Sequence, residues 1–164
     1  MKGGEDGFSS LELLIAVGIA LLMMMGAATV GRKFLLEAVV ERETACLVSD
    51  LRWAQQHNRT ASYHCAHFSS ARPSSVDDYR VRVRSSGYEV SGYGFNGFRG
   101  WEHVCPTSVF LSPPVRTGTV FFQEGGDARN PMTIMVYSAL GRASASRYVI
   151  IDAAGRIRVD RRPP

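Results

Sequence analysis

The pattern of hydrophobic positions begins with a continuous apolar run near the N-terminus. Residues 13–31 contain no charged side chain and no polar residues at the 3.6-residue interval of an amphipathic helix. These 19 residues would form a helix about 28 Å long, close to the thickness of a bilayer's hydrocarbon core. The leader MKGGEDG differs from that of a secretory signal peptide, because its acidic residues outnumber its lysine and no small-residue cleavage motif follows. The run therefore predicts a membrane-spanning helix over residues 8–31.

An amphipathic helix is predicted directly after this run, over residues 32–60. A stripe of buried-type residues recurs there at helical spacing: Val40, Thr44, Leu47, Leu51 and Ala54. Charged residues flank it, namely Glu41, Glu43, Asp50 and Arg52. The stripe is expected to pack against a globular head, so the two predicted segments form one long helix with a membrane half and a packed half.

After about residue 61 the apolar period changes from 3.6 to 2, which is typical of strands. Residues 79–84 and 88–90 are expected to form a hairpin with a turn at 85–87, and further strands are expected at 118–122, 133–137, 147–151 and 156–159. Residues 152–155 would be the hairpin turn between the last two. Residues 91–114 are rich in glycine, aromatics and proline, and are expected to form a long irregular connection. The predicted fold is therefore α+β, with one long N-terminal helix packed on an antiparallel β-sheet head at 61–164.

Composition is compatible with one modest globular domain. The chain has 164 residues, is 45% hydrophobic and carries a formal net charge of +4. The charge is unevenly distributed, because the chain from Tyr79 onward contains twelve arginines but only six acidic residues. We find no glycine-rich phosphate loop after a strand, no nucleophile elbow and no plausible carboxylate pair, so we predict no enzyme activity, no catalytic residue and no cofactor.

Two groups of arginines are candidates for binding phosphates. Arg80, Arg82 and Arg84 fall on one face of a predicted strand. At the C-terminus, a second group consists of Arg156, Arg158, Arg161 and Arg162. Such a patch would bind nucleic acid through its backbone without reading its sequence. An ordinary hairpin strand with a solvent-exposed arginine face explains the C-terminal pattern equally well.

Glu12 is a charged residue next to the apolar run. One explanation is a capping box, since Glu12 follows Ser9 by three residues. A carboxylate at membrane depth is nevertheless costly and indicates a functional site. Cleavage between Gly7 and Phe8 would create an α-amine four residues before Glu12, and amine and carboxylate of neighbouring subunits could then neutralise each other.

The stretch GFSSLELLIA resembles the class III signal of type IV pilins and type II secretion pseudopilins. The resemblance implies that residues 1–7 are a leader, and that a prepilin peptidase cuts after Gly7 and methylates the Phe8 amine. It also implies that Glu12 helps to register each subunit with other pilins in a filament. The positive-inside rule alone leaves the orientation ambiguous or reversed, because the leader is acidic and Arg32-Lys33 follow the run. Pilin-type cleavage implies a cytoplasmic leader, and thus a single-pass bacterial inner-membrane protein with a periplasmic head.

The C-terminal half, with TVFF, IMVYSALGRAS and RYVIIDAAGRIRV, resembles the GspH/FimT group of minor pilins and pseudopilins. Members serve as the H minor pseudopilin of type II secretion or as minor pilins of type IV pili. Some pilus-associated members bind double-stranded DNA in natural transformation through a Gly-Arg-x-Arg motif, which residues 155–158 match. The resemblance leaves two functions open: a structural subunit of a secretion pseudopilus or pilus, and a DNA-binding minor pilin.

The three cysteines, Cys46, Cys65 and Cys105, allow at most one intrachain disulfide. We expect Cys65–Cys105, because Cys46 belongs to the predicted helix, where a buried thiol is more common. Cys65-Ala-His67 and His103-Val-Cys105 could also face each other as a Cys2His2 zinc site if both segments were extended. That spacing is not diagnostic, and no metal is predicted.

Overall fold

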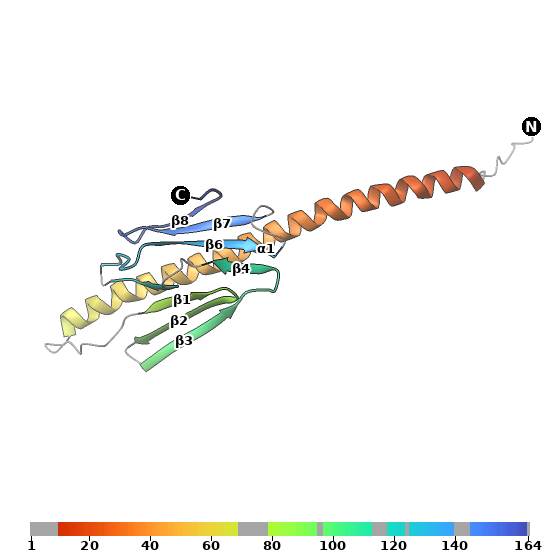
Figure 1. The fold of residues 1–164 in the computed structure, drawn as a ribbon. Helices are drawn as coiled ribbons and strands as arrows, with labels where there is room; N and C mark the ends of the chain where they lie inside the picture. Colours follow the sequence, from red (N-terminus) through yellow and green to blue (C-terminus); the bar gives the residue numbers. More distant parts are fainter. Residues whose placement is uncertain are drawn as a thin grey trace, which may run out of the picture. The chain divides into compact units, whose positions relative to one another are not determined.

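The computed structural model describes residues 10–68, 79–94, 97–112, 118–123, 125–139 and 145–163 (Figure 1). Within these ranges, the side chains of residues 60–68 and 93–99 are not described. The chain divides into two compact units, residues 1–35 and 36–164. The helix α1, Ser10–Phe68, contributes residues to both units.

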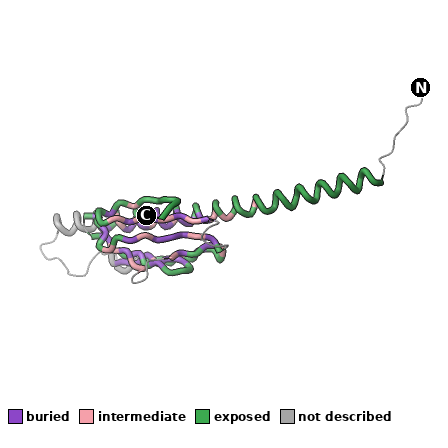
Figure 2. The backbone as a smooth tube through the Cα atoms, turned by 45° about the horizontal axis from the view of Figure 1, so that its top comes forward, coloured by how far each residue is buried: buried purple, intermediate pink, exposed green. Residues whose placement is uncertain are grey.

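The first unit contains the apolar part of α1. From Ser10 to Leu35 every residue except Gly31 is exposed, as the green tube in Figure 2 shows. By length and composition, α1 is suited to cross a membrane. The predicted apolar helix is therefore confirmed, and its described side chains are exposed.

The second unit packs the rest of α1 against eight strands. They are β1 Arg80–Arg84, β2 Gly87–Gly94, β3 Gly97–Val104, β4 Val109–Ser112, β5 Thr119–Phe121, β6 Met132–Ser138, β7 Ser146–Ile151 and β8 Ile157–Asp160. They form two sheets of four strands with the orders β3-β2-β1-β5 and β4-β6-β7-β8. All pairings are antiparallel. The predicted α+β class and both predicted hairpins are confirmed.

The core lies between α1 and the two sheets. The predicted stripe is fully buried at Val40, Leu47, Leu51 and Ala54, and Thr44 is 3% exposed. The Thr44 hydroxyl donates a hydrogen bond to the Val40 carbonyl at 2.7 Å, which satisfies its polar group inside the core. Inward residues of both sheets complete the core, such as Val81 and Val90 of one sheet and Ile134 and Val149 of the other.

Two boundaries differ from the sequence prediction. Helix α1 continues to Phe68 rather than ending near residue 60. Residues 91–114 are not an irregular connection, because they contain the end of β2, all of β3 and all of β4. Gly92 has a packing role, because a Cβ atom there would lie 2.6 Å from the Tyr79 ring and 2.8 Å from the Tyr79 Cα atom. A close approach between neighbouring backbones, rather than a loop, explains this glycine.

Candidate functional site

Glu12 lies in the first turn of α1. The side chains that follow it are strongly exposed, with Leu14 75% and Met23 71% accessible. A carboxylate at a helix N-terminus is favourable, because it faces the positive end of the helix dipole. The predicted cleavage site, Gly7 and Phe8, lies outside the described residues, so its role stays a prediction.

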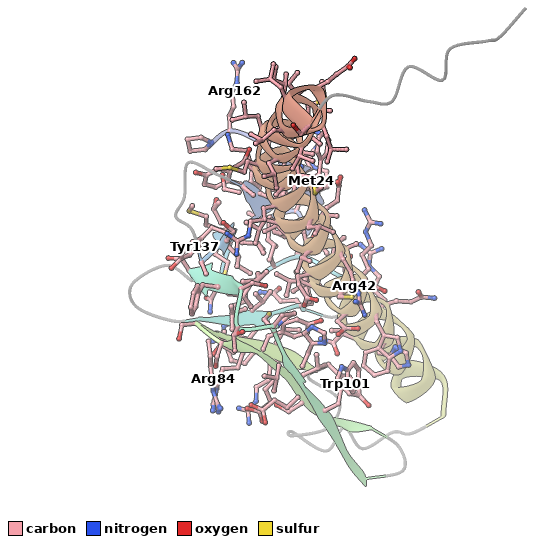
Figure 3. All side chains as sticks on the ribbon, turned by 90° about the vertical axis from the view of Figure 1, so that its right-hand side faces the viewer. Met24, Arg42, Arg84, Trp101, Tyr137 and Arg162 are labelled. Atoms are coloured by element: carbon pink, nitrogen blue, oxygen red, sulfur yellow. The ribbon has the colours of Figure 1, made fainter. Side chains whose placement is uncertain are left out.

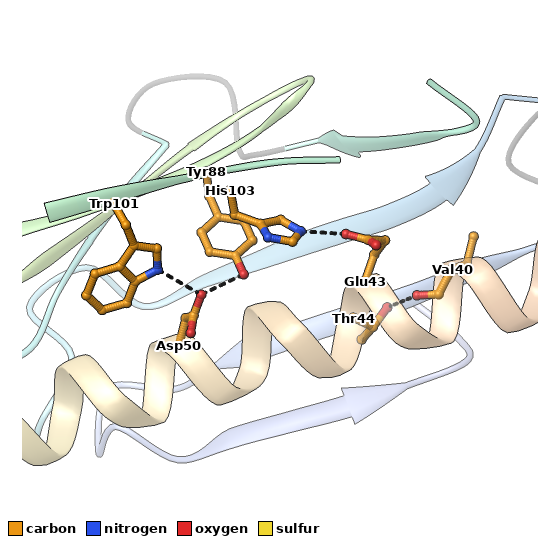
Figure 4. A network of polar contacts seen from close by, with 7 residues as sticks. All are labelled: Val40, Glu43, Thr44, Asp50, Tyr88, Trp101 and His103. Atoms are coloured by element: carbon orange, nitrogen blue, oxygen red, sulfur yellow. Dashed lines mark hydrogen bonds and ion pairs between the residues drawn. The ribbon is translucent and has the colours of Figure 1, made fainter. Parts of the chain in front are cut away.

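Polar contacts join α1 to the sheet that contains β2 and β3 (Figure 4). Nε2 of His103 lies 2.7 Å from Oε2 of Glu43. About two turns further along α1, Asp50 accepts hydrogen bonds from the Tyr88 hydroxyl at 2.8 Å and from the Trp101 indole at 3.3 Å. Burial raises the pKa of Tyr88 well above its ordinary value, and the hydrogen bond and charge of Asp50 raise it further. These contacts fix the register of the helix against the sheet.

Glu43 is buried, which differs from the sequence prediction. The sequence predicts a charged residue on the flank of the stripe, whereas only 4% of Glu43 is exposed. The signal was present in the spacing, because Glu43 follows Val40 by three residues and precedes Leu47 by four. Both intervals place it on the buried face of α1, where a carboxylate needs a partner such as His103.

Cys105 lies beside Glu43, one residue beyond the end of β3, and it carries a free thiol. Burial raises the pKa of Cys105 to about 12, with further contributions from the charge and hydrogen bond of Glu43 and from Cys46. The predicted Cys65–Cys105 disulfide is absent from the structure. Cys105 lies beside Glu43, whereas positions 43 and 65 are about 33 Å apart along the axis of α1, far more than the Cα separation that a disulfide spans.

The Cys2His2 arrangement considered from the sequence also fails. It required Cys65 and His67 to lie in an extended segment, but both positions belong to the helix α1. The other half of the pattern is retained, because a ring nitrogen of His103 and Sγ of Cys105 lie close together. Their third neighbour is Glu43, and the three ligand atoms lie within 4.8 Å of one another.

The C-terminal arginines are exposed, and among the described residues a salt bridge is formed by Arg156, with Asp152. Arg158 lies on the edge strand β8, and Arg161 and Arg162 follow that strand. The side chain of Arg162 extends away from the ribbon in Figure 3. Arg156 instead donates a hydrogen bond from Nε to Asp152 at 2.8 Å. The backbone N–H of Arg156, and then this side-chain contact, hold the pKa of Asp152 below its usual range.

The predicted stripe of Arg80, Arg82 and Arg84 is confirmed as the exposed face of β1. It belongs to a different sheet from β8. Arg84 is drawn toward acidic neighbours, with Glu89 at 3.4 Å and Glu102 at 3.6 Å. The two groups of arginines therefore do not form one strand face.

Comparison of the structure with solved proteins identifies the fold. The minor pseudopilin EpsH from the Type 2 Secretion System of Vibrio cholerae matches with a TM-score of 0.55 over 74% of this chain and 96% of that one, at 10% identity. The chain has a pilin-like fold. The type IV minor pilin FimU of Pseudomonas aeruginosa matches with a TM-score of 0.50 over 79% of this chain and 90% of its own, at 15% identity. No protein-family model and no curated protein matches the sequence.

Proposed function

We propose that the chain is a filament subunit, a minor pseudopilin or minor pilin that is anchored in the bacterial inner membrane before assembly. The observation that carries this proposal is the exposed apolar part of α1, with Glu12 in its first turn. Exposed apolar surface of this size needs a lipid or protein environment. In a filament, the same surfaces of neighbouring subunits would cover one another. The pilin-like fold of the second unit supports this proposal.

In this proposal a prepilin peptidase cuts between Gly7 and Phe8 and methylates the new amine. The Phe8 amine and the Glu12 carboxylate of a neighbouring subunit then neutralise each other inside the helix bundle. A carboxylate that enters an apolar bundle without a partner is strongly disfavoured, so only a correctly aligned subunit is stable there. Glu12 thus acts as the register contact for assembly, and the protein acts in pilus formation or protein secretion.

The experiment expresses the chain in a bacterial host with a prepilin peptidase and a pilus or secretion system. Mass spectrometry should find an N-methylated Phe8 terminus in the wild type and an uncut chain in Gly7→Leu. Glu12→Gln should be processed but absent from sheared filaments. Glu37→Gln is the matched control, because Glu37 is an exposed carboxylate on the same helix, and it should assemble normally. Normal processing of Gly7→Leu, or equal assembly of both glutamine variants, would contradict the proposal.

The exposed arginines at the end of the second unit favour a second function, the binding of double-stranded DNA. Arg158, Arg161 and Arg162 project three positive charges with a single intervening carboxylate, Asp160. Binding through phosphates alone should fall steeply with salt. In a gel-shift assay at low salt, changing these three arginines to alanine should abolish retardation. A triple alanine variant at positions 80, 82 and 84 removes the same charge from β1 and is the control. Equal weakening by both variants would indicate a general charge effect and would exclude a C-terminal site.

A further inference from the structure

Three metal-binding side chains of different chemistry meet between α1 and the end of β3. Glu43 comes from the helix, and His103 and Cys105 come from one face of an extended segment, two residues apart. Glu43 is 4% exposed and Cys105 is 7% exposed, while 30% of the His103 side chain is accessible. Val104, between the two ligands of the extended segment, is 70% exposed and points the opposite way. The group is thus largely buried, with His103 as its most accessible member, rather than a set of surface residues.

The donor set of this group matches the charge of a divalent cation. Glu43 is almost fully buried, and Nε2 of His103 lies 2.7 Å from its carboxylate. A divalent cation would balance the group completely, because one carboxylate, one thiolate and one neutral imidazole together carry two negative charges. A buried site with zero net charge avoids the large cost of a desolvated ion.

We propose that Glu43, His103 and Cys105 bind one Zn²⁺ ion, with water in the fourth position. Carboxylate oxygen, imidazole nitrogen and thiolate sulfur are the three donor types that Zn²⁺ takes in proteins. In a tetrahedral site such atoms lie about 3.4–3.8 Å apart. The three atoms are already within 4.8 Å of one another, so small side-chain rotations, which include opening the 2.7 Å contact between His103 and Glu43, bring them to ligand distances. Binding releases the thiol proton of Cys105 and any proton shared by His103 and Glu43 to solvent.

The surroundings hold the ligands in place. The His103 ring stacks on the Tyr88 ring with centroids 4.9 Å apart and an angle of 24° between the planes. The Tyr88 hydroxyl is in turn fixed by Asp50 on α1. Contacts that orient a metal-binding histidine contribute strongly to metal affinity. The backbone N–H of Cys105 donates to the Ser86 carbonyl at 2.9 Å, which fixes the chain at the third ligand.

The test uses the full chain in detergent micelles with a phosphine reductant, first stripped with a chelator and then titrated with Zn²⁺ and with Co²⁺. We expect one equivalent of Zn²⁺ per chain after dialysis. Co²⁺ should give a near-ultraviolet thiolate-to-metal charge-transfer band together with tetrahedral d–d bands. The variants Glu43→Gln, His103→Gln and Cys105→Ser should each bind Zn²⁺ at least about 100-fold more weakly. Circular dichroism confirms that each variant is folded, and Cys105→Ser carries the test alone if Glu43→Gln does not fold.

The matched control is Cys46→Ser, which removes the thiol one helical turn from Glu43. Cys46 does not belong to the group within 4.8 Å, so this variant should keep one equivalent of Zn²⁺ and the charge-transfer band. The proposal is wrong if wild-type protein binds less than one equivalent, or if Cys105→Ser binds as tightly as the wild type. It is also wrong if Co²⁺ binds without a thiolate band. These results do not depend on filament assembly.

Discussion

Asn58 joins α1 to three buried backbone groups, and its replacement by alanine should strongly destabilise the second unit. Its amide nitrogen donates to the Tyr79 carbonyl at 3.1 Å and the Phe122 carbonyl at 2.8 Å, and its oxygen accepts from the Tyr79 N–H at 2.9 Å. Only 3% of Asn58 is exposed, so water cannot replace these contacts. At about 1 kcal/mol for each buried group left unsatisfied, the loss is about 3 kcal/mol.

Urea unfolding of residues 36–164, followed by the fluorescence of Trp53 and Trp101, measures this loss. The midpoint should fall with no change in the urea dependence of the free energy of unfolding. Arg52→Ala, an exposed change on the same helix, should alter stability by less than about 0.5 kcal/mol. A loss below about 1 kcal/mol in Asn58→Ala would refute the reasoning, because it would mean that the three groups find other partners.

Asn58→Asp separates the hydrogen bonds from the shape of the side chain. At neutral pH the carboxylate has no donor for the two carbonyls and is buried, so this variant should be at least as unstable as Asn58→Ala. Burial raises the folded-state pKa of such a carboxyl above its unfolded value. The protonated form regains one donor and is favoured in the folded state, so stability relative to wild type should improve as the pH falls from 7 to 5. A constant difference across that range would contradict this explanation.

Three further predictions concern the second unit. Gly155 has φ +72°, and a Cβ atom there would overlap a neighbouring carbonyl oxygen, so Gly155→Ala should cost more than about 2 kcal/mol by urea unfolding. Asp152 has a lowered pKa because Arg156 donates hydrogen bonds to it. Its contribution to folding stability is therefore present above about pH 4 and lost below it. The melting temperature of Asp152→Asn should accordingly approach that of wild type as the pH falls from 7 to 3. Tyr88 has a raised pKa because it is buried and contacts Asp50. The free energy of unfolding should therefore fall above about pH 10, where tyrosine ionises in the unfolded chain. In a pH series of melting curves, Tyr88→Phe should reduce this loss of stability at alkaline pH.

The parts of the fold that were predictable are those with a one-sided hydrophobic pattern. The β1 sequence RVRVR alternates completely, and its burial alternates in the same way. The stripe on α1 was likewise visible, because one face of that helix is covered by two sheets. Patterns of this kind are strong when burial alone decides which residue type is accepted at each position.

The strand β3 could not be predicted, because its sequence does not alternate between apolar and polar residues. It lies at the edge of its sheet and pairs only with β2. Its sequence GFRGWEHV contains glycine, charged and aromatic residues rather than alternating aliphatic ones. Gly87 of the partner strand stands where a Cβ atom would overlap the His103 carbonyl oxygen. Glycine here permits two backbones to pair closely. In the sequence alone, a glycine-rich segment of this kind is typical of a turn or loop.

The spacing of the acidic residues on α1 indicates which face of the helix needs polar partners on the sheet. Glu43 and Asp50 are seven residues apart and share the helix face that contacts β2 and β3. Seven residues is close to two helical turns, so two carboxylates at this spacing beside a buried stripe must both meet the sheet. The spacing predicts that each needs a donor there, but it does not identify the donor. His103 and Tyr88 become the partners only because β2 and β3 pair in a register that places them opposite each other. The helix pattern thus determines where polar partners are required, and the sheet register determines which chemistry, including the Glu43–His103–Cys105 group, is assembled.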